Sequence, residues 1–170
     1  FLQFMGHGGG RIWSDYNLLN ASDIKTLSNT CYPFVSSLAC FASAFDLEGL
    51  SSIGETFVAE PNKGAIAHIG MSGLGYLNED LDFGHFLSEG LFVKNLTTIG
   101  EISSYTKAKF YGRYGEYSFA GHALTEGCVL LGDPLIPINR PIESGTINIS
   151  ENQFFASAGD TLKITANFNN

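Results

Sequence analysis

Four short apolar runs, each adjoined by glycine or proline, most constrain what this chain can fold into. They cover residues 1–5, 33–39, 64–71 and 128–131. Runs of this length suit strands that are buried on both faces of a sheet. The longer amphipathic stretches between them are typical of helical crossovers between parallel strands. The alternation therefore predicts an α/β fold, with a mostly parallel sheet flanked by helices.

Two capping-box sequences mark helix starts between these runs. Ser-Ile-Gly-Glu at 52–55 and Thr-Ile-Gly-Glu at 98–101 each pair a hydroxyl with a glutamate three residues later. The hydroxyl accepts from a free backbone N–H of the first turn, and the glutamate reaches back to the cap. We expect the helix that starts at 52–55 to end before Pro61, and the helix that starts at 98–101 to stop by Gly112. A further helix is expected from Leu81 to Val93, and Asp23 is expected to cap a short one.

The pattern changes after Pro137, where polar and apolar residues alternate. Residues 146–150 and 161–168 both show the period of two that is typical of antiparallel strands. About 30 residues are too few to close a β-sandwich. We expect residues 1–138 to form the α/β domain, and residues 139–170 to begin an immunoglobulin-like β domain that is cut short.

Charge and hydropathy disfavour two classes of partner. The chain carries 17 acidic and 9 basic residues, for a formal net charge of -8, and this charge repels nucleic acid backbones. No apolar run reaches the roughly 18 residues of a membrane span. We therefore expect neither nucleic acid binding nor a span.

The three cysteines form no pattern typical of zinc sites. Cys31, Cys40 and Cys128 include no C-x-x-C pair and no metal-ligand spacing with a histidine. We expect free thiols and no metal site, with Cys31 and Cys128 as core thiols. His68, inside another apolar run, is expected to be a hydrogen-bonded core histidine and not a second catalytic base.

A histidine between glycines follows the first apolar run, and a cysteine ends the second. Parallel strand ends open on one crevice, so His7 and Cys40 are expected to share a site. Cysteine peptidases need a thiolate, a proton donor for the leaving amine, and N–H groups that bind the oxyanion. Cys40 and His7 supply the first two, and the N–H groups of Gly8 and Cys40 supply an oxyanion hole. The alternative for Cys40 alone is a small buried apolar residue.

The order of these motifs resembles the gingipain-type cysteine peptidases of family C25, in the caspase and gingipain clan. The dyad spacing, 40 - 7 = 33, also fits that family. The resemblance extends over nearly the whole chain, through the following landmarks: Gly6 to Gly9 with Trp13, Asp23-Ile24, Leu27, Asn29, Pro33-Phe34-Val35, Gly54 to Phe57, Gly64 to Ala67 and Leu131 to Pro134.

The resemblance implies that residues 1–138 are the C-terminal part of a caspase-like catalytic domain. Its N-terminal half, holding an assisting acid and part of the specificity pocket, would be a partner of this chain. The family further implies protein or peptide substrates and a secreted or bacterial outer-surface location. No cofactor is expected; structural calcium occurs in some relatives, but no ligands are identifiable here.

In the same family, the loop after the third strand helps to shape the specificity pocket. The corresponding candidates for substrate binding are Ser72, Leu74, Tyr76, Glu79 and Asp80. An acid among them could anchor an arginine or lysine side chain. The two carboxylates equally fit the start of a helix, where the dipole favours negative charge.

Three functions remain open at this point. The first is a secreted endopeptidase that acts through a thioester on Cys40. The second is a sortase-like transpeptidase of type IX secretion, which would use the same dyad. The third is a catalytically silent adhesion or assembly module that keeps the fold.

Overall fold

The computed structural model describes residues 1–139 except residue 116, and residues 145–148 and 165–168. The chain divides into two compact units, Phe1–Ile138 and Asn139–Asn170.

In the second unit, β8 (Gly145–Asn148) pairs antiparallel with β9 (Thr165–Phe168). β9 lies within the segment 161–168, and β8 overlaps the segment 146–150 but begins one residue earlier. The alternation of both segments predicted antiparallel strands. The other residues of those segments, 149–150 and 161–164, lie outside the described residues. The expected immunoglobulin-like domain stays a prediction.

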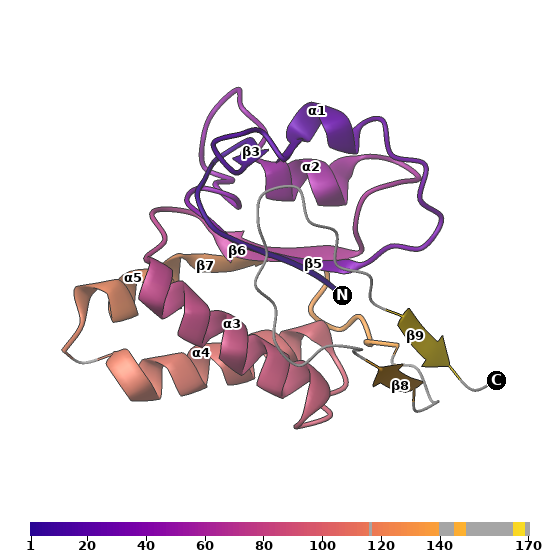
Figure 1. The fold of residues 1–170 in the computed structure, drawn as a ribbon. Helices are drawn as coiled ribbons and strands as arrows, with labels where there is room; N and C mark the ends of the chain where they lie inside the picture. Colours follow the sequence, from indigo (N-terminus) through magenta and orange to yellow (C-terminus); the bar gives the residue numbers. More distant parts are fainter. Residues whose placement is uncertain (116, 140–144, 149–164, 169–170) are drawn as a thin grey trace, which may run out of the picture. The chain divides into compact units, whose positions relative to one another are not determined.

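The first unit contains a sheet of four strands: β1 (Leu2–Met5), β5 (Phe34–Leu38), β6 (Ala67–Met71) and β7 (Cys128–Leu131), in the order β1-β5-β6-β7 (Figure 1). β1, β5 and β6 are parallel, and β7 is antiparallel to β6. Each of the four apolar runs thus contains a strand, and the predicted mostly parallel sheet is confirmed. The expected burial on both faces holds for β5 and β6 but was wrong for β1, where Leu2 and Gln3 are exposed. The direction of the last strand had no signal in the sequence.

Helices cover both faces of this sheet (Figure 1). On one face lie α1 (Ala21–Ile24) and α2 (Ile53–Ala59), and on the other α3 (Leu77–Phe92), α4 (Ile99–Tyr114) and α5 (Phe119–Gly127). Both predicted capping boxes are present, at Ser52 with Glu55 and at Thr98 with Glu101.

Several helix limits differ from the prediction. Asp23 does not cap α1; Asn20 does, accepting from two N–H groups, while the Asp23 carboxylate accepts from the Asn20 N–H at 2.9 Å. α3 begins at Leu77, four residues before the predicted start. The prediction missed the first turn because its residues are mostly polar and lack the apolar spacing of the rest of the helix. α4 continues two residues past Gly112, since an exposed glycine weakens a helix without ending it. α5 was not predicted.

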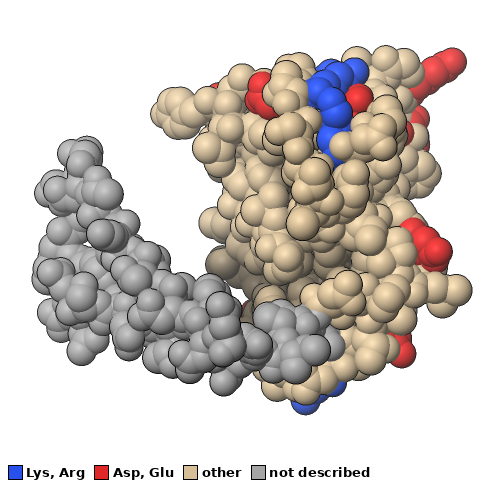
Figure 2. All heavy atoms as spheres, turned by 90° about the vertical axis from the view of Figure 1, so that its right-hand side faces the viewer, with Lys and Arg blue, Asp and Glu red and all other residues tan. Residues whose placement is uncertain are grey.

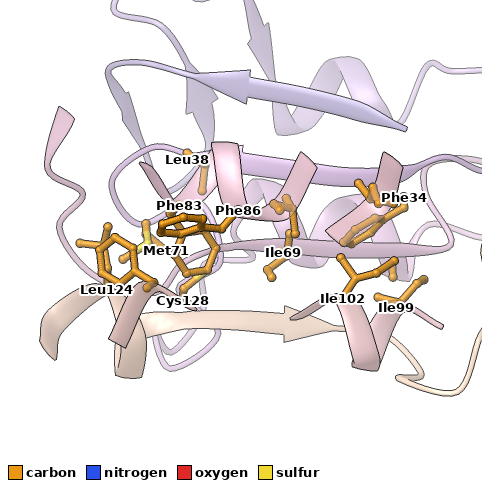
Figure 3. Close-up of a cluster of buried hydrophobic side chains, with 14 residues drawn as sticks. Phe34, Leu38, Ile69, Met71, Phe83, Phe86, Ile99, Ile102, Leu124 and Cys128 are labelled. Atoms are coloured by element: carbon orange, nitrogen blue, oxygen red, sulfur yellow. The ribbon is translucent and has the colours of Figure 1, made fainter. Parts of the chain in front are cut away.

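Two apolar cores lie on the two faces of the sheet. Figure 3 shows the first, where Leu38 and Ile69 of the central strands lie beside Phe83 of α3 and Ile102 of α4. The second contains residues from the other face and from α1 and α2, with Trp13 among them. Every residue of β5 and β6 is buried. Polar side chains on these strands therefore have to find partners inside the protein.

Charged side chains are sparse on the face that Figure 2 shows. A small cluster of basic side chains lies at the top, over the α1–α2 end, and no continuous basic stripe crosses the described atoms in this view. In the part of the chain that the structure describes, no helix has the length and hydropathy to cross a membrane.

The cap of α2 offers a first test, because this helix start also holds the loop near the sheet edge: the Ile53 N–H donates to the Gly10 carbonyl at 2.6 Å. Ser52→Ala removes the hydroxyl that accepts from the Glu55 N–H. The free energy of unfolding should fall by about 1 kcal/mol, measured by denaturant titration. Ser51→Ala, at an exposed neighbouring position, is the matched control, and an equal loss in both variants would contradict the capping role.

Candidate active site

His7 and Cys40 leave the sheet at the same edge. In the parallel pairing of β1 with β5, Met5 is the partner of Leu38. The Gly6 N–H extends this pairing by donating to the Leu38 carbonyl at 3.2 Å. His7 and Cys40 each follow two residues after these partners, on strands that lie about 4.8 Å apart. The register thus brings both residues to one level of the sheet edge.

A tight hairpin follows His7 at once. It consists of β2 (Gly8–Gly9) and β3 (Ile12–Trp13), and β4 (Leu19–Asn20) adds a third strand. The sequence analysis missed this small sheet, since its strands are only two residues long.

Gly8 packs the hairpin against the segment between β5 and Cys40. A Cβ atom at Gly8 would lie 2.8 Å from the Ile12 carbonyl oxygen and 3.0 Å from the Ala39 Cβ. Only glycine fits this gap without a shift of its neighbours. The residue after His7 is therefore packed against the residue before Cys40.

The Gly8 N–H is directed away from the hairpin partner. The Ser14 N–H donates to the His7 carbonyl at 2.8 Å, which makes His7 and Ser14 a hydrogen-bonded pair. Bonded and non-bonded pairs alternate in antiparallel strands, so Gly8 and Trp13 form a non-bonded pair. This leaves the Gly8 N–H outside the β2–β3 pairing.

The chain turns sharply after Cys40. Phe41 has a φ of 58°, in the left-handed region that a bulky side chain rarely adopts. Two backbone hydrogen bonds hold the turn. The Phe41 N–H donates to the Gly73 carbonyl at 2.7 Å, and the Ser43 N–H donates to the Met71 carbonyl at 2.8 Å. Strained turns of this kind concentrate at functional sites. Nothing in the sequence indicated that Phe41 would adopt this conformation.

The predicted substrate loop lies beside the Cys40 sulfur. The Gly75 N–H donates to Cys40 Sγ at 3.3 Å, and the Gly75 carbonyl oxygen lies 3.9 Å from the same sulfur. Cys40 is half-buried, whereas the His7 side chain is exposed.

The side chains of this loop differ in their surroundings. The Ser72 hydroxyl donates to the Gly127 carbonyl at 2.8 Å and so fixes the loop to the end of α5. Leu74 is exposed, and Tyr76 packs edge-on against Phe119.

The two acids of the loop region belong to the first turn of α3. Glu79 is half-buried, while Asp80 is only 5% exposed. One oxygen of Asp80 lies 2.6 Å from the position that a Cβ would take on Gly75, and its Oδ1 has no hydrogen-bond partner. Burial and the neighbouring Glu79 raise the pKa of Asp80 to about 6, against the effect of a hydrogen bond from the Tyr76 backbone. Asp80 thus lies beneath the loop and supports it.

The other two cysteines differ from each other. Cys128 is buried, and desolvation raises the pKa of its thiol to about 12, as expected of a core thiol. Cys31 is exposed in the coil before β5, so the prediction that it is a core thiol was wrong. Within the described residues, no group of three or more His, Cys, Asp or Glu side chains is arranged to hold a metal ion.

Residues 1–139 match the sequence model of the family described as Peptidase family C25. The chain belongs to this family. Its members are cysteine peptidases, so the C25 domain carries a fold associated with hydrolysis of protein substrates. No curated protein matches the chain significantly.

Solved structures of proteases share the fold. The crystal structure of the Arg-specific cysteine proteinase gingipain R (RgpB) matches with a TM-score of 0.73 and 18% identity, over 99% of this chain and 40% of that one. The complex of the Porphyromonas gingivalis RgpB pro- and mature domains matches with a TM-score of 0.73 and 17% identity, over 99% of this chain and 41% of that one. A structure described only as a protease matches with a TM-score of 0.72 and 22% identity, over 96% of this chain and 41% of that one. The C25 chain therefore spans about 40% of the length of these proteins.

Asp80→Asn tests the buried carboxyl beneath the loop. Because the pKa is raised to about 6 from 3.8, the folded state holds this proton more tightly than the unfolded state does. The resulting stabilisation is fully present below about pH 4 and is lost as the pH rises through 6. Between these limits the free energy of unfolding of the wild type should fall by on the order of 2 kcal/mol relative to that of the variant. Denaturant titrations at each pH measure this difference. Asp15→Asn, at an exposed position, should parallel the wild type, whereas a parallel curve for Asp80→Asn would refute the assignment.

Proposed function

We propose that the C25 domain contributes the catalytic pair of a secreted cysteine endopeptidase, with Cys40 as nucleophile and His7 as its acid and base. The observation that carries the proposal is the shared register, with both residues two positions beyond the partners Met5 and Leu38. The contact of Gly8 with Ala39 supports it, because it fixes the two loops against each other.

The chemistry follows from the side chains and N–H groups at this edge. The Cys40 thiolate attacks the scissile carbonyl carbon, and its oxygen becomes an oxyanion held by the N–H groups of Gly8 and Cys40. As the C–N bond breaks, His7 donates a proton to the leaving amine, and a thioester remains on Cys40. His7 then takes a proton from water, whose attack on the thioester releases the carboxylate and restores the thiol.

The loop after β6 forms a wall for the substrate in this proposal. Its position beside the Cys40 sulfur, through Gly75, supports a role for Leu74 and Tyr76 in contacting residues next to the scissile bond. Ser72 and Asp80 hold the loop from behind, through the bond to Gly127 and the packing under Gly75. Glu79, half-buried at the same helix start, is the acid of the pair nearer to solvent.

Cys40→Ala in the full-length protein should reduce peptide hydrolysis by roughly 10⁴-fold or more, and His7→Ala should do the same, because the two groups act as one unit. Initial rates on a fluorogenic peptide library measure this. Cys31→Ala removes an exposed thiol and should leave the rate unchanged. Full turnover in Cys40→Ala would exclude the mechanism.

Product analysis in labelled water, together with an active-site probe, separates the alternatives. A hydrolase incorporates heavy oxygen from labelled water into the new carboxylate, whereas a transpeptidase joins the acyl group to an amine. A silent module shows neither product, and its Cys40 does not react with an activated-ketone probe.

A further inference from the structure

A buried polar network crosses the second core, between the hairpin after His7 and the turn after Cys40. The Trp13 Nε1–H donates to the Ser37 hydroxyl at 2.9 Å. That hydroxyl lies 2.7 Å from His68 Nε2, and His68 Nδ1 lies 2.8 Å from the Ser43 hydroxyl. Trp13 is 5% exposed and the other three residues are fully buried.

The two ends of the network lie next to the proposed catalytic residues. Trp13 is the direct partner of Gly8 in the hairpin, and Gly8 is the residue that follows His7. It is also held by Phe4 of β1, whose ring stacks on it at 4.8 Å. Ser43 closes the turn that begins at Cys40, and its own N–H is bound to the Met71 carbonyl.

The imidazole of His68 fits a closely defined space. A Cβ at Gly54 would lie 2.5 Å from His68 Nδ1, and one at Gly70 would lie 2.8 Å from its Cε1. Desolvation lowers the pKa of His68 to about 3, so the ring is neutral at physiological pH. A neutral imidazole has one donor and one acceptor, so it joins two hydroxyls in either tautomer. The prediction of a hydrogen-bonded core histidine is confirmed, and this ring additionally connects two loops.

We propose that His68 is a positioning residue, which fixes the His7 hairpin relative to the Cys40 turn through Ser37 and Trp13 on one side and Ser43 on the other. The inference rests on the proposed function of His7 and Cys40. His68 itself touches neither substrate nor the reacting atoms. Its effect is on the alignment of thiolate and imidazole, where displacements of about 1 Å cost up to about 100-fold in rate.

Two substitutions divide the network. The amide of His68→Gln reaches the place of Nε2 and keeps the bond to Ser37, but it gives up Ser43. The amide of His68→Asn reaches the place of Nδ1 and keeps the bond to Ser43, but it gives up Ser37 and Trp13. In the full-length protein, each should lower kcat by about 10- to 100-fold with KM changed less than threefold, because none of the four side chains of the network belongs to the substrate loop, whose bonds to the turn are made by backbone groups.

Alkylation of Cys40 by iodoacetamide, followed by peptide mapping that separates it from Cys31, should slow in both variants without any substrate. Ser37→Ala should behave likewise. Ser36→Ala is the matched control, since the adjacent Ser36 hydroxyl is buried with no partner in the described structure. Ile102→Ala destabilises the opposite core and controls for stability alone. Both controls should keep kcat at temperatures where they are folded.

A merely structural role predicts that kcat and the Cys40 alkylation rate of the folded His68 variants stay within twofold of the wild type, and this result would overturn the proposal. If neither His68 variant folds, Ser43→Ala removes only the hydroxyl that bonds His68 Nδ1 and gives the same readout. Cys40→Ala is measured in parallel. If that variant keeps turnover, the proposed function fails; if it is inactive while the His68 variants are fully active, only the positioning role fails.

Discussion

The parallel pairing of β1 with β5 is the constraint on which the rest of the site depends. It fixes where two adjacent strands end, and so where the residues that follow them emerge. A shift by one residue would turn every side chain of β1 to the other face of the sheet. Because β5 is buried on both faces, such a shift would place Phe4 and Met5 against the wrong cores. The packing of two cores thus specifies the position of the proposed catalytic pair.

Much of the site's geometry is made by backbone groups. The Gly75 N–H at the Cys40 sulfur and the Phe41 N–H bound to Gly73 are backbone donors, which any residue except proline can supply. This agrees with a fold that is shared at TM-scores of 0.72 to 0.73 while identity is 17% to 22%. Most of the sequence can therefore differ while the fold is kept.

The sequence allowed prediction of the features that depend on local patterns. Apolar runs revealed the strands, and capping boxes revealed α2 and α4, because both signals are contained within a few residues. It also indicated which strand ends would carry His7 and Cys40.

The missed features depend on contacts between distant segments. The left-handed turn at Phe41 is held by Gly73, and the burial of Asp80 follows from the packing of Gly75 over it. The exposure of Cys31 depends on the path of the coil before β5. Such features leave no periodicity in the chain, so pattern analysis did not detect them.

The fit of the His68 ring between Gly54 and Gly70 makes these three positions a single steric unit. One methyl group added at either glycine would occupy space that the ring now fills. Alanine at position 54 or 70 would therefore require something smaller than an imidazole at position 68, and also a shift of the backbone oxygen of Ala42 or Ser37, which lies 2.8 Å from the added Cβ. Such a chain would have to join its two loops by other means. Sequence change at these three places is thereby tied together, although they come from two different elements, a helix and the strand that follows it in the chain.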